Sequence, residues 1–184
     1  FLYIGGCVIA IAIVKWNLHK RIALNIINLI GTNIVNIILG FMIATAVMSM
    51  WISNTATAVM MLPIAIAIVA QLKDNPDTIE DENLNFGKAL MLAIAYSASI
   101  GGVATLIGTP PNLVLAGVVE ETFGYEITFA KWFQFGFPIS IILLFICWKY
   151  LTSIAFKFKQ KTFPGGREEI SKQLNALGKI SYEE

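Results

Sequence analysis

The chain has 184 residues, of which 57% are hydrophobic and 14% are charged, and its mean hydropathy is +0.72. This composition is too apolar for an ordinary soluble domain and predicts an all-α integral membrane protein. The net charge of +1 carries little information. The charges instead fall in clusters between apolar stretches, as in the loops of multi-pass membrane proteins. Nothing in the composition favours nucleic acid as a partner.

Residues 1–33 are predicted to contain the end of a transmembrane helix and then an interfacial helix. The basic residues of segment 15–21 place this end in the cytoplasm by the positive-inside rule. Residues 16–30 alternate apolar side chains with asparagines, an amphipathic pattern that suits a helix lying on the inner membrane surface. The chain opens on Phe1 without a signal-peptide pattern, which indicates a fragment of a longer protein.

Residues 22–72 contain no Asp, Glu, Lys or Arg, and a polar run at residues 49–55 interrupts them. Polar groups at membrane depth need hydrogen-bond partners. Ser, Asn and Thr also favour helix N-caps over helix interiors. We therefore expect one helix to stop and another to begin at Ser53, Asn54 and Thr55.

The two apolar arms around this break begin and end beside basic loops, which fits either two spanning helices or a re-entrant hairpin over residues 34–70. We favour the re-entrant hairpin. Two full spans would place Ser53 to Thr55 at the far interface, where a capped turn has no need of packed polar partners at Ser49.

A second charge-free stretch, residues 89–119, has three glycines and a Pro-Pro pair in its middle. Such a sequence cannot form an unbroken helix, so we predict a discontinuous helix over 86–122. The acidic segment 71–88 before it is expected to be a solvated cytoplasmic loop rather than a metal site.

After Gly124, residues 127–156 are predicted to be a spanning helix. Lys131, Trp132 and Trp148 lie near its ends and are expected to act as interfacial anchors. The basic residues that follow predict a cytoplasmic tail over 157–184.

If the two breaks meet, the residues that start the second half of each helix can bind an anion. Helix N-termini carry partial positive charge and bind carboxylate or phosphate. The arms that stop near Ile52 and Gly108 offer free carbonyls to a hard cation. Ser49 and Ser53 are four residues apart, so on one helical face both hydroxyls can reach the same alkali ion. Discontinuous helices of this kind are a known transporter design.

Other functions compete with transport as explanations of these breaks. The Ser-Asn-Thr break alone is equally compatible with a helix–helix contact, but a double proline in a charge-free stretch is costly unless it lines a cavity. An intramembrane enzyme is disfavoured, because no Asp, Glu, His or Lys lies in the apolar runs around the breaks. An uncoupled anion channel or exchanger remains the alternative, although it has no need of a hydroxyl pair for a cation.

Three long motifs stand out: KWNLHKRIAL at residues 15–24, MSMWISNTAT at 48–57 with MLP at 61–63, and SIGGVATLIGTPPN at 99–112. Together they resemble the divalent anion/sodium symporter family, which includes the INDY-type dicarboxylate and citrate transporters. The resemblance covers nearly the whole chain. It implies sodium-coupled symport of divalent anions by a plasma-membrane homodimer, in which a transport domain moves against a scaffold in an elevator-type cycle.

The resemblance also implies the ligands. A sodium ion would be bound by Ser49, Ser53, Asn54 and the backbone near Gly108, and the substrate would contact Asn54, Thr55, Thr109 and Pro110. Residues 34–156 would form half of the transport domain, and the interfacial helix would join it to the scaffold. Family members have two inverted repeats and this chain has one, so a second repeat of the same protein would complete the pocket. The preferred anion, whether succinate, malate, citrate or sulfate, stays open.

Overall fold

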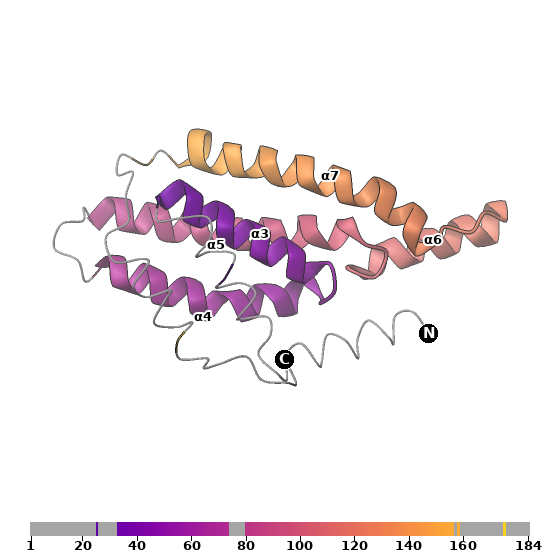
Figure 1. Ribbon diagram of the computed structural model, residues 1–184, viewed down its shortest axis with the longest axis horizontal. Coiled ribbons are helices and arrows are strands. Elements are labelled where there is room, and N and C mark those ends of the chain that lie inside the picture. Colours follow the sequence, from indigo (N-terminus) through magenta and orange to yellow (C-terminus); the bar gives the residue numbers. More distant parts are fainter. Residues whose placement is uncertain (1–24, 26–32, 74–79, 157, 159–174, 176–184) are drawn as a thin grey trace.

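The structure, a computed structural model, describes residues 25, 33–73, 80–156, 158 and 175. The regular elements in these residues are all helices, as the sequence predicts (Figure 1). They are α3 (Ile34–Ser49), α4 (Asn54–Lys73), α5 (Glu80–Ala104), α6 (Pro110–Phe123), α7 (Phe129–Lys149) and a short π-helix, η1 (Tyr150–Ala155). The predicted interfacial helix and cytoplasmic tail lie almost entirely outside the described residues.

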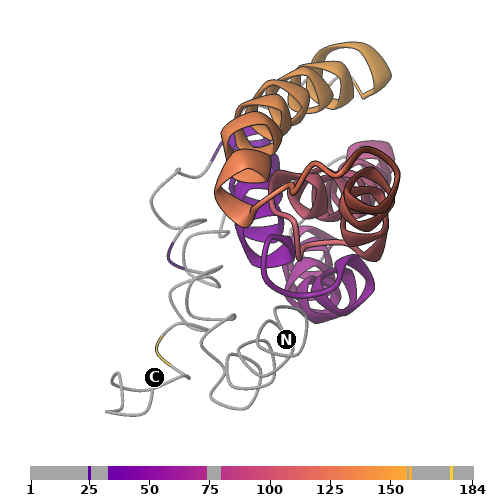
Figure 2. The same ribbon diagram turned by 90° about the vertical axis from the view of Figure 1, so that its right-hand side faces the viewer.

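Helix α5 lies at the centre of the bundle and packs against α3, α4 and α7 (Figure 1, Figure 2). In Figure 1, α3 and α5 run in the same direction, whereas α4 and α7 return. The turn between α3 and α4 therefore lies at the same end of the bundle as the break between α5 and α6. The Thr105 hydroxyl donates a hydrogen bond to the Met50 carbonyl at 2.6 Å, which joins the two breaks directly.

Both predicted breaks are confirmed. Helix α3 ends at Ser49 and α4 begins at Asn54, while α6 begins at Pro110. Proline is tolerated at this first helical position because its missing N–H would have no helical partner there. The expected helix ends near Ile52 and Gly108 are too late, since α3 ends at Ser49 and α5 ends at Ala104.

The expected solvated loop over 71–88 is wrong at both ends. Helix α4 continues to Lys73, and α5 begins at Glu80 rather than at residue 86. Three of the five acidic residues that suggested a loop, Glu80, Asp81 and Glu82, fall in the first turn of α5. A helix dipole favours negative charge at that end, so an acidic run is compatible with a helix start.

Helices α3, α4 and α5 pack through buried apolar side chains, among them Phe41, Met61 and Leu90. The backbones of α3 and α5 also approach closely, because a Cβ on Gly101 would collide with the backbone of Ala46. In lipid, small residues and van der Waals packing hold helices together. This close approach places the C-terminal end of α3 against α5.

Helix α7 is tied to its neighbours by three side-chain hydrogen bonds. The Trp132 indole N–H donates to the Val103 carbonyl at 2.9 Å, and the Ser140 hydroxyl donates to the Ile100 carbonyl at 2.9 Å. The Trp148 indole N–H donates to a carbonyl of α3 at 3.1 Å. The two tryptophans therefore use their N–H groups on neighbouring helices, and their role as interfacial anchors stays a prediction.

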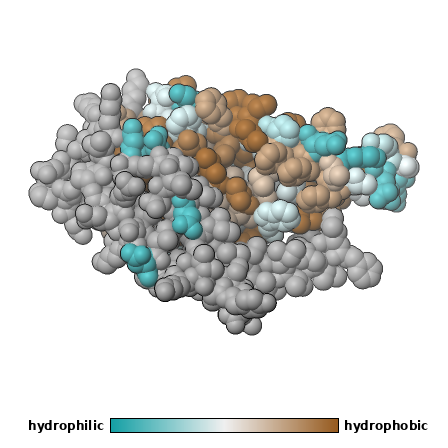
Figure 3. Space-filling model, in the orientation of Figure 1, coloured by the Kyte–Doolittle hydropathy of each residue, from teal (hydrophilic) through white to brown (hydrophobic). Residues whose placement is uncertain are grey.

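Two helical stretches in the described part of the chain are long and apolar enough to cross a membrane, Leu84–Ala104 and Phe129–Ala155. The apolar helices Ile34–Ser49 and Asn54–Ala70 are shorter. On the face shown in Figure 3, hydrophobic residues dominate the coloured area over the bundle, and hydrophilic residues gather at the far end of α6. Much of α7 is both apolar and exposed, a surface suited to lipid or to other protein segments.

Candidate functional site

Ser49, the last residue of α3, is fully buried at the centre of the site. Its Oγ lies 2.7 Å from Asn54 Oδ1 and 2.6 Å from the Ala98 carbonyl oxygen. A hydroxyl has one hydrogen, so it donates fully to only one of these acceptors at a time. Three oxygen atoms thus converge with a single hydrogen between them. Such a set of oxygens suits a hard cation, whose ligands are carbonyl, amide and hydroxyl oxygens.

Gly102 of α5 packs directly against this site. A Cβ at Gly102 would collide with Asn54 Oδ1. A Cβ on Gly108 would lie 2.5 Å from the Gly102 carbonyl oxygen, so Gly108 packs on the same residue. The structure therefore brings together Ser49, Asn54 and Gly108, three of the four residues predicted to hold sodium.

Ser53 is placed differently from the prediction. Ser49 and Ser53 do not share a helical face, because α3 ends at Ser49 and Ser53 lies outside both helices. The i, i+4 relation holds only within a helix, which is why this argument is wrong. Ser53 is exposed, and its Oγ accepts a hydrogen bond from the Ala56 N–H at 3.4 Å, as a helix N-cap does.

The residues predicted to touch substrate lie on the accessible side of the breaks. Thr55 and Pro110 are exposed, whereas Asn54 and Thr109 are half-buried. The first backbone donors of α4 that find partners are those of Ala56 and the residue after it, both bonded to Ser53. Within the described residues, the N–H groups of Asn54 and Thr55 have no partner. Free N–H groups at the positive end of a helix favour an anionic ligand.

The N-terminus of α6 offers fewer backbone donors than the sequence suggests. Pro110 and Pro111 have no N–H, and the Asn112 N–H donates to the Thr109 carbonyl at 3.2 Å. The expectation of free N–H groups from two helix ends therefore holds for α4 and fails for the first three residues of α6. At this helix end the Thr109 hydroxyl makes no capping hydrogen bond.

Sequence reasoning did not identify three participants in the site. The Ala98 carbonyl belongs to a helix interior, and Thr105 reaches Met50 from 55 positions away. The Asn112 side chain donates from Nδ2 to the Gly102 carbonyl at 2.9 Å and to the Thr105 carbonyl at 2.8 Å. Only Asn112 had a sequence signal, because it ends the Gly-Thr-Pro-Pro-Asn run.

Thr57, on α4 one turn after Asn54, has a fully buried hydroxyl without a hydrogen-bond partner in the described part of the chain. An unpaired buried polar group costs about 1–3 kcal/mol. We expect Thr57→Val, which keeps the side-chain shape, to raise the free energy of unfolding of the full-length protein by about 1 kcal/mol. The measurement is the apparent melting temperature in detergent, with exposed Thr122→Val as the control. A lower melting temperature for Thr57→Val would contradict this expectation.

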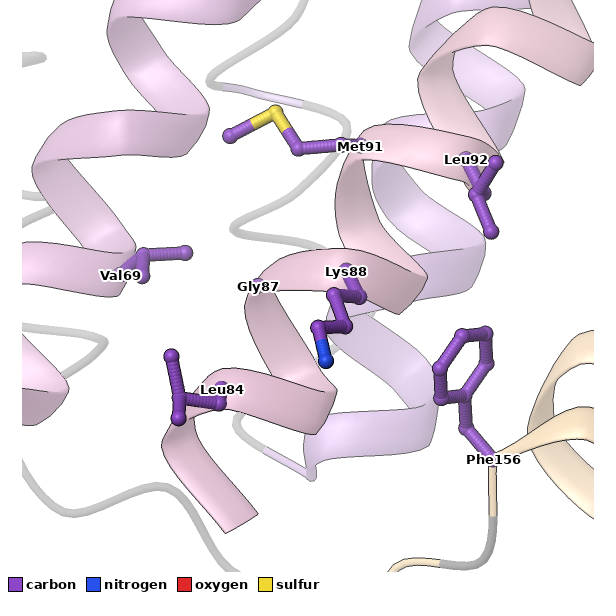
Figure 4. Close-up of a pocket in the computed structure, with 7 residues that line it drawn as sticks. All are labelled: Val69, Leu84, Gly87, Lys88, Met91, Leu92 and Phe156. Atoms are coloured by element: carbon purple, nitrogen blue, oxygen red, sulfur yellow. The ribbon is translucent and has the colours of Figure 1, made fainter. Parts of the chain in front are cut away.

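A cavity of about 560 Å³ at the opposite end of the bundle lacks these features (Figure 4). Its lining is apolar apart from one lysine and consists of Val69, Leu84, Gly87, Lys88, Met91, Leu92 and Phe156. No group of three His, Cys, Asp or Glu side chains that could hold a metal occurs in the described residues. The two breaks are therefore the candidate site.

The comparisons with known proteins point to a family of transporters. A sequence model of the citrate transporter family matches residues 1–181. The chain is 50% identical over 186 residues to the sodium-dependent dicarboxylate transporter of Staphylococcus saprophyticus, and 49% identical to that of Staphylococcus aureus strain USA300. Each alignment covers 100% of this chain and 36% of the relative. The chain thus spans about a third of the length of these relatives.

Proposed function

Because the chain belongs to the citrate transporter family, as its motifs predict, we propose that it forms part of a sodium-coupled symporter for dicarboxylates or related divalent anions. The family and the names of the relatives point to a transporter rather than an enzyme. The chain supplies one sodium site and half of the substrate site, and the second inverted repeat of the same protein supplies the remainder. The protein works as a homodimer by elevator-type alternating access.

The observation that carries this proposal is the convergence of oxygen atoms on Ser49. Sodium is held by Ser49, Asn54 and the backbone around Gly108, and by Ser53 from just before the start of α4 rather than from a helical face shared with Ser49. In the structure, Asn54 Oδ1 and the Ala98 carbonyl compete for the single Ser49 hydrogen. With sodium on Asn54 Oδ1, that hydrogen donates to Ala98 alone. Ion binding thereby removes the competition and fastens the end of α3 to α5.

The substrate carboxylate lies beside the ion, against the start of α4. Asn54 and Thr55 contribute free N–H groups there, and Thr109 and Pro110 contact the substrate from the start of α6. A cation near a carboxylate offsets its charge at a depth where an unpaired charge is costly. Sodium therefore binds first and orders the turn between α3 and α4 for the anion.

The length of α3 supports a re-entrant hairpin over 34–70. The 16 residues of α3 span about 24 Å at about 1.5 Å per residue. A spanning helix must cover a hydrocarbon core of about 30 Å. The hairpin, the broken helix and α7 then form one half of the transport domain over 34–156. The protein lies in the plasma membrane. Its cytoplasmic side carries segments 15–21 and 71–88 and the tail over 157–184.

Succinate binding to the full-length protein in sodium and in choline buffer tests the proposal. We expect saturable binding in sodium and its loss in choline, because the anion site is completed only when the cation offsets the carboxylate charge. A potassium buffer is the control for ionic strength. Equal binding in all three buffers would contradict symport and favour the uncoupled channel or exchanger.

A further inference from the structure

Asn112 is the side chain that closes the break between α5 and α6. It lies in the first turn of α6 and is 7% exposed. A helix end leaves its last carbonyls without helical partners; Asn112 Nδ2 donates to one of these, at Gly102, and to the carbonyl of Thr105, the residue that follows α5. The amide has two N–H hydrogens, so both are used.

The two carbonyls that Asn112 holds belong to the residues that contact the turn between α3 and α4. Gly102 packs against Asn54 Oδ1. Thr105 donates from Oγ1 to the Met50 carbonyl at 2.6 Å. One side chain of α6 thus holds both residues, Gly102 in the last turn of α5 and Thr105 just after it, that contact the turn between α3 and α4.

We propose that Asn112 is a positioning residue for the sodium site, an inference that rests on the proposed function. It contributes no atom to the oxygen cluster around Ser49. It sets the separation of the two breaks by holding the carbonyls of Gly102 and Thr105, and hence the place that Asn54 Oδ1 occupies. Groups that orient metal ligands in this way change affinity when they are removed, even though they do not touch the ion.

Asn112→Asp in the full-length protein is the sharpest test, because the substitution keeps the shape and replaces the amide N–H donors by oxygen facing two carbonyls. We expect the sodium concentration for half-maximal dicarboxylate uptake to rise by about tenfold or more. The KM for dicarboxylate at saturating sodium should stay within about twofold of wild type, because excess sodium refills the site. Asn85→Asp, at an exposed position of α5, is the matched control.

A purely structural role predicts a different result. It would lower the amount of folded protein and the maximal uptake, and would leave the half-saturating sodium concentration unchanged. If wild-type uptake depends on sodium and Asn112→Asp gives that result, this inference is overturned and the proposed function stands. Uptake by wild type without sodium dependence would overturn both.

A second variant covers a failure of Asn112→Asp to fold. Asn112→Ser keeps one shorter donor, so at most one of the two carbonyls retains a partner, and it places no oxygen of a carboxyl group against them. We expect a smaller rise in the half-saturating sodium concentration, of about threefold to tenfold. A half-saturating concentration equal to that of wild type in this variant would overturn the inference.

Discussion

Asn54→Ala in the full-length protein is expected to reduce sodium-dependent dicarboxylate uptake by about 100-fold. The substitution removes Oδ1, which lies 2.7 Å from the fully buried Ser49 hydroxyl. A hydrogen bond or ligand contact to a charged group contributes about 1.5–3 kcal/mol. In the proposed site Asn54 contacts both the cation and the carboxylate, so its removal weakens the binding of sodium and of the substrate together.

The control for this variant is Asn85→Ala, which removes the same side chain from an exposed position of α5 outside the breaks. We expect its uptake to match wild type, because surface substitutions away from a site change stability and binding little. Uptake by Asn54→Ala at the wild-type level, in protein of normal abundance, would show that the Ser-Asn-Thr break is a packing feature.

Gly102→Ala is expected to lower the affinity for sodium by about 100-fold, because a misplacement of about 1 Å in a functional group has effects of this size. The added Cβ would collide with Asn54 Oδ1 and push this oxygen away from Ser49. Alanine is otherwise favoured over glycine within a helix by up to about 1 kcal/mol. The loss should therefore appear in the half-saturating sodium concentration more than in the amount of folded protein.

Gly117→Ala is the matched control for this variant. Gly117 lies in α6, and a Cβ there would meet no heavy atom within 4 Å. Its uptake should equal that of wild type, and its helix should be slightly more stable. If Gly102→Ala transported with wild-type sodium affinity, Asn54 Oδ1 would not occupy the place beside Gly102 in the transporting protein.

Local chemistry explains why the two breaks could be predicted from the sequence. Ser53 precedes the first residue of α4 and caps it through a side-chain oxygen. Pro110 cannot continue a helix and can begin one. Each of these events is decided within a few residues, so the helix starts were placed correctly.

The arrangement of the site could not be predicted in the same way. The spacing of Ser49 and Ser53 predicts a shared cation only if one continuous helix runs through both, whereas the partners of Ser49 are Asn54 and a carbonyl 49 positions away. The link from Thr105 to Met50 likewise depends on how α5 packs against α3. A backbone carbonyl looks the same in every residue, so no sequence signal marks Ala98 as a participant.

The start of α5 was missed for a different reason. The acidic run before Lys88 resembles a solvated loop in composition, yet the helix begins at Glu80. Glutamate is a good helix former, and the helix dipole favours acidic residues in the first turn. Composition alone therefore does not separate a solvated helix start from a loop.

Equilibrium binding of sodium alone, measured on wild type and on Asn54→Ala in the full-length protein, tests the central claim most directly. The claim is that the oxygens around Ser49 hold a cation before any anion arrives. It predicts saturable sodium binding by wild type. For Asn54→Ala it predicts either the loss of at least part of that binding or an affinity at least tenfold weaker, and a tenfold change in affinity corresponds to about 1.4 kcal/mol of binding free energy. Identical sodium isotherms for the two proteins would contradict it.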